Sequence, residues 1–490
     1  MRSLTLLAAG FALALSSAAC SQDGTLPSAA EDMGAADIDS IEYSGTGRWF
    51  QFGQAPNPTL PWPQFDVSAY TATINYQTPA ARVQMTRSQT VEPGRARPAP
   101  VTQLRDQYVN AASAWRMAVP GGSTPGTAPV PQAQPAAVEE RTMEIWSTPH
   151  GFLKAALANN ATSQPAGDGS EVSFTAGRNM YVGTINGDNQ VERIQTWIDN
   201  TVLGDTSVET MFSEYRDFGG VTFPSRIMRS QGGHPVLDIT VSEVTANPAA
   251  DIAVPDAVLS FTPPAVNVEV EKLADGVFYL RGGSHHSLAI DQADHVVVVE
   301  GPQNEARSSA VIAKVKETIP NKPIRYVINT HAHFDHAGGL RTYVDEGATI
   351  VTHALNQAFY EQAWAAPRTL NPDMLAKSGK SATFETVTGK HVLTDGTRAI
   401  EIHEIVGNGH NDAFLMVYLP AERILTQADM WNPPQPNAPP PSAPSPYTVN
   451  LYENIQRLKL PVRQMAGVHG SRVAPLAALR ASAMPTTATN

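Results

Sequence analysis

The stretch Thr330-His331-Ala332-His333-Phe334-Asp335-His336-Ala337-Gly338-Gly339 decides how this chain is interpreted. It follows Tyr326-Val327-Ile328-Asn329, an apolar run that predicts a buried strand. In an extended chain, residues two apart project from the same side, so His331 and His333 can bind one cation together. Asp335 and His336 lie where the chain turns toward a helix, and they can reach a second cation nearby. The two glycines that end the stretch leave room for a tight turn.

The residue types favour zinc. Imidazole nitrogen and carboxylate oxygen are good zinc ligands, and the chain's single cysteine, Cys20, lies far from this stretch. A structural zinc site usually has four protein ligands, often thiolates, whereas a set of histidine and aspartate fits an open site that keeps a water. The chain has 13 histidines, and 11 of them follow residue 280, so the chemistry is expected in the C-terminal half.

The His-x-His-x-Asp-His pattern resembles the hallmark of the metallo-β-lactamase superfamily, and the resemblance extends over roughly Val268 to Val473. That family takes three more ligands from later strand ends. Each has a counterpart in order: Gly407-Asn408-Gly409-His410, Leu425-Thr426-Gln427-Ala428-Asp429 and Gly467-Val468-His469-Gly470. The resemblance implies two zinc ions per chain. The first would be held by His331, His333 and His410, the second by Asp335, His336 and His469, and Asp429 would bridge them.

Two departures from the family pattern stand out. Asn411-Asp412 follow His410 where a small or hydroxyl residue and a glycine are usual, so Asp412 either orients His410 or caps the next turn. Ala428 replaces the usual glycine before the bridging aspartate.

The pair His285-His286 follows two glycines in an early loop and is either a substrate contact or a solvated loop pair. His295, His353, His391 and His403 have no partner pattern and are interpreted as surface or satisfied core residues.

The resemblance implies a zinc-dependent hydrolase that uses a metal-bound hydroxide for direct attack, without a covalent acyl-enzyme. Asp335 is the expected catalytic residue, because its carboxylate can orient the nucleophile and later pass a proton. The segments Ala365–Lys390 and Asn432–Pro446 are predicted to wall the cleft. Their alanine, proline and tryptophan content favours a small-molecule ester, lactone or lactam as substrate, as in β-lactamases.

Two other functions are compatible with the same motif. Some superfamily members bind one iron and oxidise sulfur compounds, and the ligands for that reaction are also present. Alternatively, the protein is an envelope lipoprotein that binds lipid and carries a vestigial metal site. A nucleic-acid partner is disfavoured, because the formal net charge is −12 and phosphate neutralisation needs clustered lysine and arginine.

The start of the chain predicts export. Residues 1–20 combine a positive start, a short apolar run and small residues before Cys20, as in a signal peptide. Ser17-Ala18-Ala19-Cys20 resembles a bacterial lipobox, which would attach the protein to a membrane through a lipidated Cys20. The expected location is therefore the periplasm or the outer membrane. Residues 21–40 are predicted to be a flexible tether, and the sequence leaves the oligomeric state open.

Residues 41–262 form a predicted β-rich, antiparallel domain, interrupted by an exposed Pro/Gly-rich insert at 120–137. Its predicted strands are Tyr70–Tyr76, Arg82–Val91, Glu171–Phe174, Tyr181–Ile185, Arg193–Asp199 and Val236–Val244, with a hairpin turn at residues 186–189. Part of it is loosely similar to the curved sheets of periplasmic lipoprotein-carrier proteins. Without a catalytic motif, it is interpreted as a scaffold for the second domain.

Residues 263–490 form a predicted α/β domain, because strands and helices alternate after Thr262-Pro263-Pro264. The predicted strands include Val277–Leu280, Ser287–Ile290, His295–Glu300, Ile324–Asn329, Ala399–Ile405, Ala413–Leu419, Arg423–Thr426 and Gln464–Val468, and the helices are Asn304–Ile319 and Asn450–Leu458. The family resemblance implies that this domain is an αββα sandwich.

Overall fold

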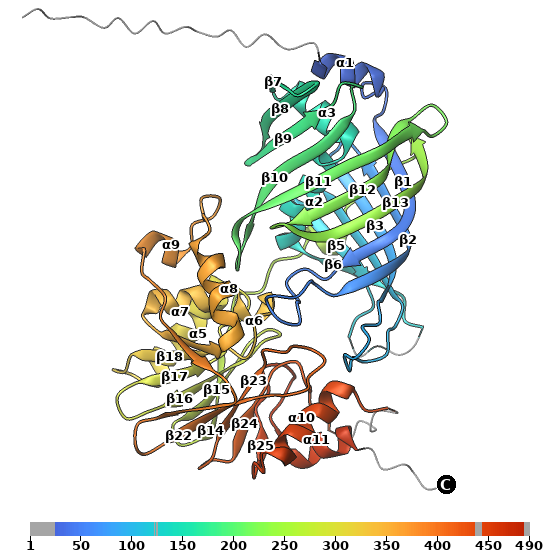
Figure 1. Ribbon diagram of the computed structural model, residues 1–490. Helices are drawn as coiled ribbons and strands as arrows, with labels where there is room; N and C mark the ends of the chain where they lie inside the picture. Colours follow the sequence, from blue (N-terminus) through green and yellow to red (C-terminus); the bar gives the residue numbers. More distant parts are fainter. Residues whose placement is uncertain (1–24, 122, 124–125, 437–442, 485–490) are drawn as a thin grey trace, which may run out of the picture.

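The structure is a computed structural model that describes residues 25–121, 123, 126–436 and 443–484. A large curved sheet forms from strands between residues 40 and 246, and a layered α/β part follows from residue 269 (Figure 1). The predicted signal peptide, the lipobox with Cys20 and residues 21–24 lie outside the described residues. Within those residues, no helix is long and apolar enough to cross a membrane.

Thirteen antiparallel strands form the first sheet, in the order β6-β5-β4-β3-β2-β1-β13-β12-β11-β10-β9-β8-β7. The strands are β1 (Ser40–Phe50), β2 (Gln64–Asn75), β3 (Ala80–Gln89), β4 (Gln103–Asn110), β5 (Ser113–Ala118), β6 (Val130–Ala133), β7 (Thr162–Ala166), β8 (Gly169–Ala176), β9 (Asn179–Ile185), β10 (Val191–Asn200), β11 (Gly204–Asp217), β12 (Thr222–Gln231) and β13 (His234–Ala246). The prediction of an antiparallel, β-rich N-terminal half is confirmed.

The sheet is irregular at its centre, where glycines let the strands approach. The pairing of β1 with β13 shifts register between Ser44 and Gly45, and such bulges increase the local twist of a sheet. A Cβ atom at Gly45 would lie 2.1 Å from the carbonyl oxygen of Thr240. Only glycine therefore fits there. The resulting curvature lets the sheet wrap around helices α2 and α3 (Figure 1).

Helices fill the concave side of this sheet. They are α1 (Thr25–Asp32), the 3-10 turn η1 (Pro135–Ala137), α2 (Val138–Trp146) and α3 (Pro149–Ala158), and the short α4 (Asp256–Leu259) follows the last strand. Two predictions are wrong here. The tether at 21–40 contains α1, because Leu26, Ala29 and Met33 bury their side chains in the core that the sheet shares with α2 and α3. The insert at 120–137 contains β6 and η1 rather than only an exposed loop.

His150 on α3 shows how α1 is held and supports a prediction. Its ring is fully buried, and its Nε2 donates to the carbonyl oxygen of Met33 at 3.0 Å. Burial lowers the pKa of His150 from 6.5 to about 4. The unfolded chain therefore binds a proton that the folded protein excludes, and stability is lost as the pH falls from 6.5 toward 4, by about 3 kcal/mol in total. The free energy of unfolding is measured by urea titration at pH 7 and at pH 4. Between these two pH values it is expected to fall by about 3 kcal/mol less in His150→Gln than in the wild type. An identical pH dependence would contradict this.

The C-terminal part contains two sheets. The seven-stranded sheet has the order β14-β15-β16-β17-β18-β19-β20, parallel from β17 onward, and the six-stranded sheet has the order β21-β22-β23-β24-β25-β26. The strands of the first are β14 (Glu269–Ala274), β15 (Val277–Arg281), β16 (Ser287–Asp291), β17 (Val296–Val299), β18 (Ile324–Ile328), β19 (Thr349–His353) and β20 (Phe384–Val387). Those of the second are β21 (Lys390–Thr394), β22 (Ala399–Glu404), β23 (Leu415–Leu419), β24 (Ile424–Thr426), β25 (Gln464–Met465) and β26 (Ala474–Pro475).

Three apolar cores define four layers. One core joins the facing sheets, with Val297 of β17 and Val417 of β23 among its members. A second joins the seven-stranded sheet to α5 and α7 through residues such as Val311 and Tyr343. A third joins the six-stranded sheet to α10 and α11. The helices are α5 (Glu305–Thr318), α6 (Phe334–Ala337), α7 (Leu340–Glu346), α8 (Ala354–Ala365), α9 (Met374–Ser378), α10 (Pro446–Arg457) and α11 (Leu476–Ala483). The expected αββα sandwich is confirmed.

Candidate metal centre

The decisive stretch leaves the carboxyl end of β18 and runs into α6. Thr330 and the first two histidines are buried in the connection, and α6 carries Asp335 and His336. The connection is held from within, since Asn329 Nδ2 donates to the carbonyl oxygen of His331 at 2.7 Å. This bond holds the backbone of the connection at His331.

The predicted first site forms one cluster. His331, His333, His410 and Asp429 each offer a ligand atom, and all of these atoms lie within 4.8 Å of one another. Asp429 Oδ2 lies 3.1 Å from His331 Nε2 and 3.2 Å from His410 Nε2. Strand ends far apart in the sequence, after β18 and β24, therefore converge on one point.

The predicted second site forms an adjoining cluster. Asp335, His336 and His469 come within 4.8 Å of one another together with a fourth residue, His285. Asp429 contacts this cluster as well: its Oδ2 lies 3.0 Å from His336 Nε2, and its Oδ1 lies 2.7 Å from His469 Nε2. The structure brings all seven predicted residues together, with Asp429 between the two groups as expected for a bridge.

The centre combines ionised carboxylates with imidazoles of both kinds. Burial lowers the pKa of His336, but Asp429 and Glu300 outweigh it and raise that pKa well above its ordinary value. Burial raises the pKa of Asp429, but His336 and the hydrogen bonds from neighbouring histidines outweigh it and hold that pKa well below its ordinary value. Burial likewise raises the pKa of Asp335, and the hydrogen bond from His285 and the charge of His336 bring it below its usual range. Both side chains are therefore carboxylates. Burial lowers the pKa of His331 to about 4, so that imidazole is neutral and can act as a ligand.

The buried nitrogen of His333 tests whether a metal fits. Its Nδ1 is buried, and among the described residues it has no hydrogen-bond partner, while its Nε2 is engaged elsewhere. Leaving a buried polar atom unpaired costs about 1–3 kcal/mol. A cation among His331, His333, His410 and Asp429 would give this nitrogen its partner. The residues present thus fit a metal.

Glu300 is a functional residue that the sequence did not single out. It follows β17, is fully buried, and adopts a positive φ of 73° that is uncommon outside glycine. Its Oε2 accepts a hydrogen bond from His336 Nδ1 at 2.7 Å, and its Oε1 accepts one from the Thr330 amide at 2.7 Å. Such a contact turns the other ring nitrogen of His336 toward Asp429, whose Oδ2 lies 3.0 Å from it. The sequence did contain a signal for Glu300, since this charged residue directly follows a strand made only of valines.

Two interpretations change with the structure. His285 and His286 are buried, so they are not a solvated pair. His285 Nε2 lies 3.3 Å from Asp335 Oδ2, whereas His286 Nε2 donates to the carbonyl oxygen of Gly470. Asp412 neither orients His410 nor serves as a simple cap, because its carboxylate binds Arg95 and Asn57 of the N-terminal half. The four other singled-out histidines each lie beside a carboxylate oxygen, although His353, His391 and His403 keep a buried ring nitrogen with no hydrogen-bond partner among the described residues.

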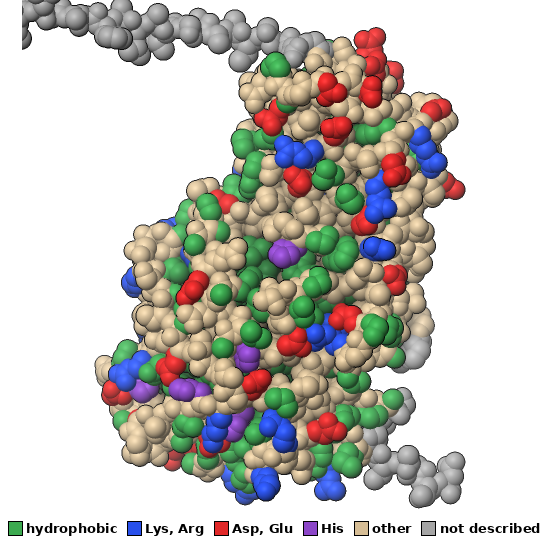
Figure 2. All heavy atoms as spheres, in the orientation of Figure 1, with side chains coloured by type: hydrophobic (Ala, Val, Ile, Leu, Met, Phe, Trp, Pro, Cys, Tyr) green, Lys and Arg blue, Asp and Glu red, His purple; other side chains and the backbone are tan. Residues whose placement is uncertain are grey.

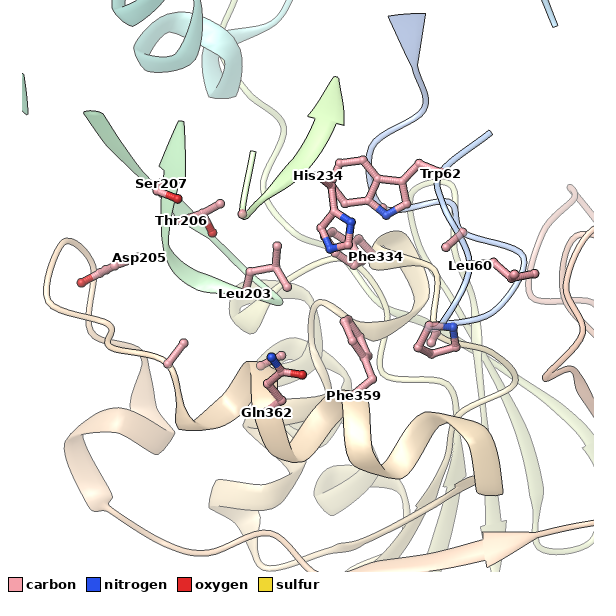
Figure 3. Close-up of a pocket in the computed structure, with 17 residues that line it drawn as sticks. Leu60, Trp62, Leu203, Asp205, Thr206, Ser207, His234, Phe334, Phe359 and Gln362 are labelled. Carbon is pink, nitrogen blue, oxygen red and sulfur yellow. The ribbon is translucent and has the colours of Figure 1, made fainter. Parts of the chain in front are cut away.

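Two cavities flank the centre. A cleft of about 890 Å³ opens beside His469, with polar walls from Ser284, Asn304 and Asn432. A second cavity, of about 510 Å³, lies between the two halves of the molecule and is bordered by Ala332 and Phe334 of the histidine stretch. Figure 3 shows Trp62 and Leu60 facing Phe359 across it. Hydrophobic side chains gather around this hollow where the halves meet (Figure 2).

The segments predicted to wall the cleft lie in different places. Arg368, from residues 365–390, donates to the carbonyl oxygens of Asn200, Thr201 and Val202, so this segment holds the N-terminal sheet. Ala366 borders the cavity between the halves. Asn432, from residues 432–446, does border the cleft beside His469. Residues 437–442 lie outside the described part of the chain.

The αββα layers and the two ligand clusters define a metal-binding sandwich domain. Residues 280–430 match the family model described as the metallo-beta-lactamase superfamily. The match includes six of the seven predicted ligands; His469 follows it. No curated protein matches the chain. The loose similarity of the N-terminal half to lipoprotein carriers is not confirmed.

Solved structures of metallo-beta-lactamases resemble the chain over less than half its length. One from Pontibacter korlensis is 17% identical, with 44% of this chain and 97% of that chain covered and a TM-score of 0.34. One from Hirschia baltica is 21% identical, with 44% and 96% covered and a TM-score of 0.33. One from Pseudomonas aeruginosa in a mono-zinc form is 18% identical, with 45% and 95% covered and a TM-score of 0.34.

Proposed function

We propose that this protein is a zinc-dependent hydrolase with two zinc ions per chain. The observation that carries the proposal is the pair of adjoining clusters joined by Asp429, whose carboxylate lies within 3.2 Å of nitrogen atoms from both. His331, His333 and His410 would hold the first ion, and Asp335, His336 and His469 the second. Nitrogen and carboxylate donors without thiolates are typical of catalytic zinc sites.

The chain's own residues supply the remaining chemistry. A bound zinc pair lowers the pKa of water toward neutrality and polarises a substrate oxygen. Asp335 is ionised and partly exposed, so its carboxylate can accept a proton from the attacking water and return it to the leaving group. Glu300 holds His336 with its Nε2 toward the cluster. This chemistry needs no serine or cysteine nucleophile, so the proposed reaction is a direct hydrolysis.

A small-molecule ester, lactone or lactam is the proposed substrate class. The cleft beside His469 is large enough for a drug-sized molecule, and its walls combine backbone, amide and guanidinium donors that can orient a carbonyl group. We further propose that the enzyme works in the bacterial envelope, because residues 1–20 carry a predicted signal peptide.

Metal content per chain is the first test. Protein purified without a histidine tag or chelator is analysed by elemental mass spectrometry. We expect close to two zinc ions per chain, followed by hydrolysis of at least one compound in a panel of lactams, lactones and esters. One iron per chain with oxygen consumption on persulfides would instead support the sulfur-oxidising alternative. Protein that takes up no metal after incubation with zinc, and that carries co-purified lipid, would support the lipid-binding alternative.

A further inference from the structure

Two connections of the N-terminal sheet lie directly on the loops that carry the ligands. Residues 51–63 join β1 to β2, and residues 90–102 join β3 to β4. Both reach from the sheet toward the C-terminal part (Figure 1). The first pairs with the ligand loops through its backbone: the carbonyl oxygen of Gly53 accepts from the Phe334 amide at 3.1 Å, and that of Pro56 accepts from the Asp412 amide at 2.6 Å.

Ala55 lies between these two contacts and binds a ligand histidine. Its carbonyl oxygen accepts a hydrogen bond from His333 Nε2 at 3.0 Å and another from Asn411 Nδ2 at 3.2 Å. A carbonyl oxygen cannot donate, so His333 carries its proton on Nε2 and leaves the Nδ1 lone pair for the metal cluster. A metal-ligating histidine is commonly oriented by such an acceptor, and here the acceptor comes from the other half of the chain.

Gln54 binds the expected catalytic carboxylate. Its Nε2 donates to Asp335 Oδ1 at 2.8 Å, while His285 Nε2 lies 3.3 Å from the other oxygen, Oδ2. The two donors fix the rotation of the carboxyl group. Gln54 therefore sets which oxygen of Asp335 faces the second cluster.

An ion pair holds this arrangement in place. Arg95, from the second connection, binds Asp412 through two parallel hydrogen bonds of 2.8 and 3.0 Å, and Asn57 donates to the same carboxylate at 2.9 Å. The fit is close: a Cβ atom at Gly409, next to His410, would lie 1.9 Å from the carbonyl oxygen of Ala96. The bidentate ion pair and the close backbone packing at Gly409 indicate that the two connections occupy one defined position against the ligand loops.

We infer that the N-terminal sheet is a component of the metal centre, not only a scaffold beside it. Ala55 and Gln54 are positioning residues that act through His333 and Asp335, and the Arg95–Asp412 pair keeps them there. This inference rests on the metal centre proposed above. It predicts that breaking contacts in the N-terminal half weakens metal binding by the C-terminal half.

The test uses cobalt(II), whose visible absorption reports its ligands, added to metal-free full-length protein. The double variant Arg95→Met plus Asn57→Ala removes the donors to Asp412, and it is expected to weaken cobalt binding about 10–100-fold and to change the spectrum. Arg82→Met is the matched control, because Arg82 makes an equivalent bidentate pair with Asp106 on the same sheet, away from the site. Arg95→Lys is expected to recover part of the affinity. A double variant that binds cobalt with wild-type affinity and spectrum would overturn the inference.

A second measurement addresses Gln54 and the tautomer of His333. Gln54→Leu is expected to lower kcat about 10–100-fold with little change in KM, whereas Gln51→Leu in the same connection is expected to leave both unchanged. Nitrogen-15 NMR of histidine-labelled, metal-free protein should show His333 protonated on Nε2, and this signal should be lost in the double variant Arg95→Met plus Asn57→Ala. Protonation on Nδ1 in the wild type would refute the role of Ala55. Wild-type protein that takes up no metal but shows the Nε2 tautomer would refute the proposed function alone.

Discussion

Asp335→Asn is expected to reduce kcat by about 10²–10⁴-fold, the usual contribution of a positioned acid–base group. The amide keeps the size of the side chain but loses the charge that His285 and His336 stabilise in the wild type. It can neither accept a proton from water nor return one to a leaving group. The second cluster also loses an anionic donor, so weaker binding of the second zinc should accompany the loss of turnover.

Two measurements separate these effects: kcat at saturating zinc, and zinc content after dialysis. Asp294→Asn is the control, since Asp294 also pairs with a histidine, at 2.6 Å from His295 Nδ1, but precedes β17, whereas Glu300 and the site follow that strand. Its turnover should match that of the wild type. If Asp335→Asn retained full kcat with both zinc ions bound, Asp335 would not be the proton carrier.

The sequence predicted the ligands because they belong to short motifs at strand ends. His331, His333, Asp335 and His336 lie within six residues, and their spacing alone indicates two cations. His410, Asp429 and His469 were placed by the family resemblance, since spacing does not show that residues 74, 93 and 133 positions after His336 will meet it. The αββα layers followed from the same resemblance and from the alternation of strands and helices.

The residues that support the ligands could not be found in this way. Gln54 lies 281 positions before Asp335, and Arg95 lies 317 before Asp412, so no local pattern connects them. Their roles depend on how two sheets dock. For the same reason, Asp412 was predicted to act on its neighbour His410 or on the next turn, whereas its partners, Arg95 and Asn57, lie in the N-terminal half. His285 was singled out, but its burial could not be read from a loop that follows two glycines.

The N-terminal helices were missed for a different reason. Residues 138–158 contain the apolar and small side chains that strands also use, and Pro149 interrupts the helical pattern in the middle. In the structure that proline opens α3 at its first position, where its missing amide costs nothing. α1 was taken for a tether because its side chains are small. Their size is what allows close packing against α3, and the free energy comes from tertiary contact rather than helix propensity.

Glu300→Gln is expected to weaken zinc binding about 10–100-fold and to destabilise the metal-free protein. Two donors converge on this carboxylate, the Thr330 amide and His336 Nδ1, and a glutamine has only one acceptor oxygen for them. If the oxygen keeps Thr330, the amide nitrogen faces His336 and moves the histidine proton to Nε2, the atom that points at Asp429. The metal-binding lone pair is then lost.

Glu300→Ala leaves both donors without a partner in a fully buried site, and removing one side of a buried ion pair costs about 3–5 kcal/mol. Zinc affinity is measured by competition with a chelator, and the free energy of unfolding by urea titration of metal-free protein. Glu385→Gln is the matched control, because Glu385 pairs with His391 at 2.6 Å on the partly exposed surface; its stability should change by no more than about 0.5 kcal/mol. Glu300 variants that equal this control in both affinity and stability would show that the carboxylate does not orient His336. The loss of affinity in Glu300→Gln, by contrast, would show that a residue outside the ligand motif sets the donor atom of the second site.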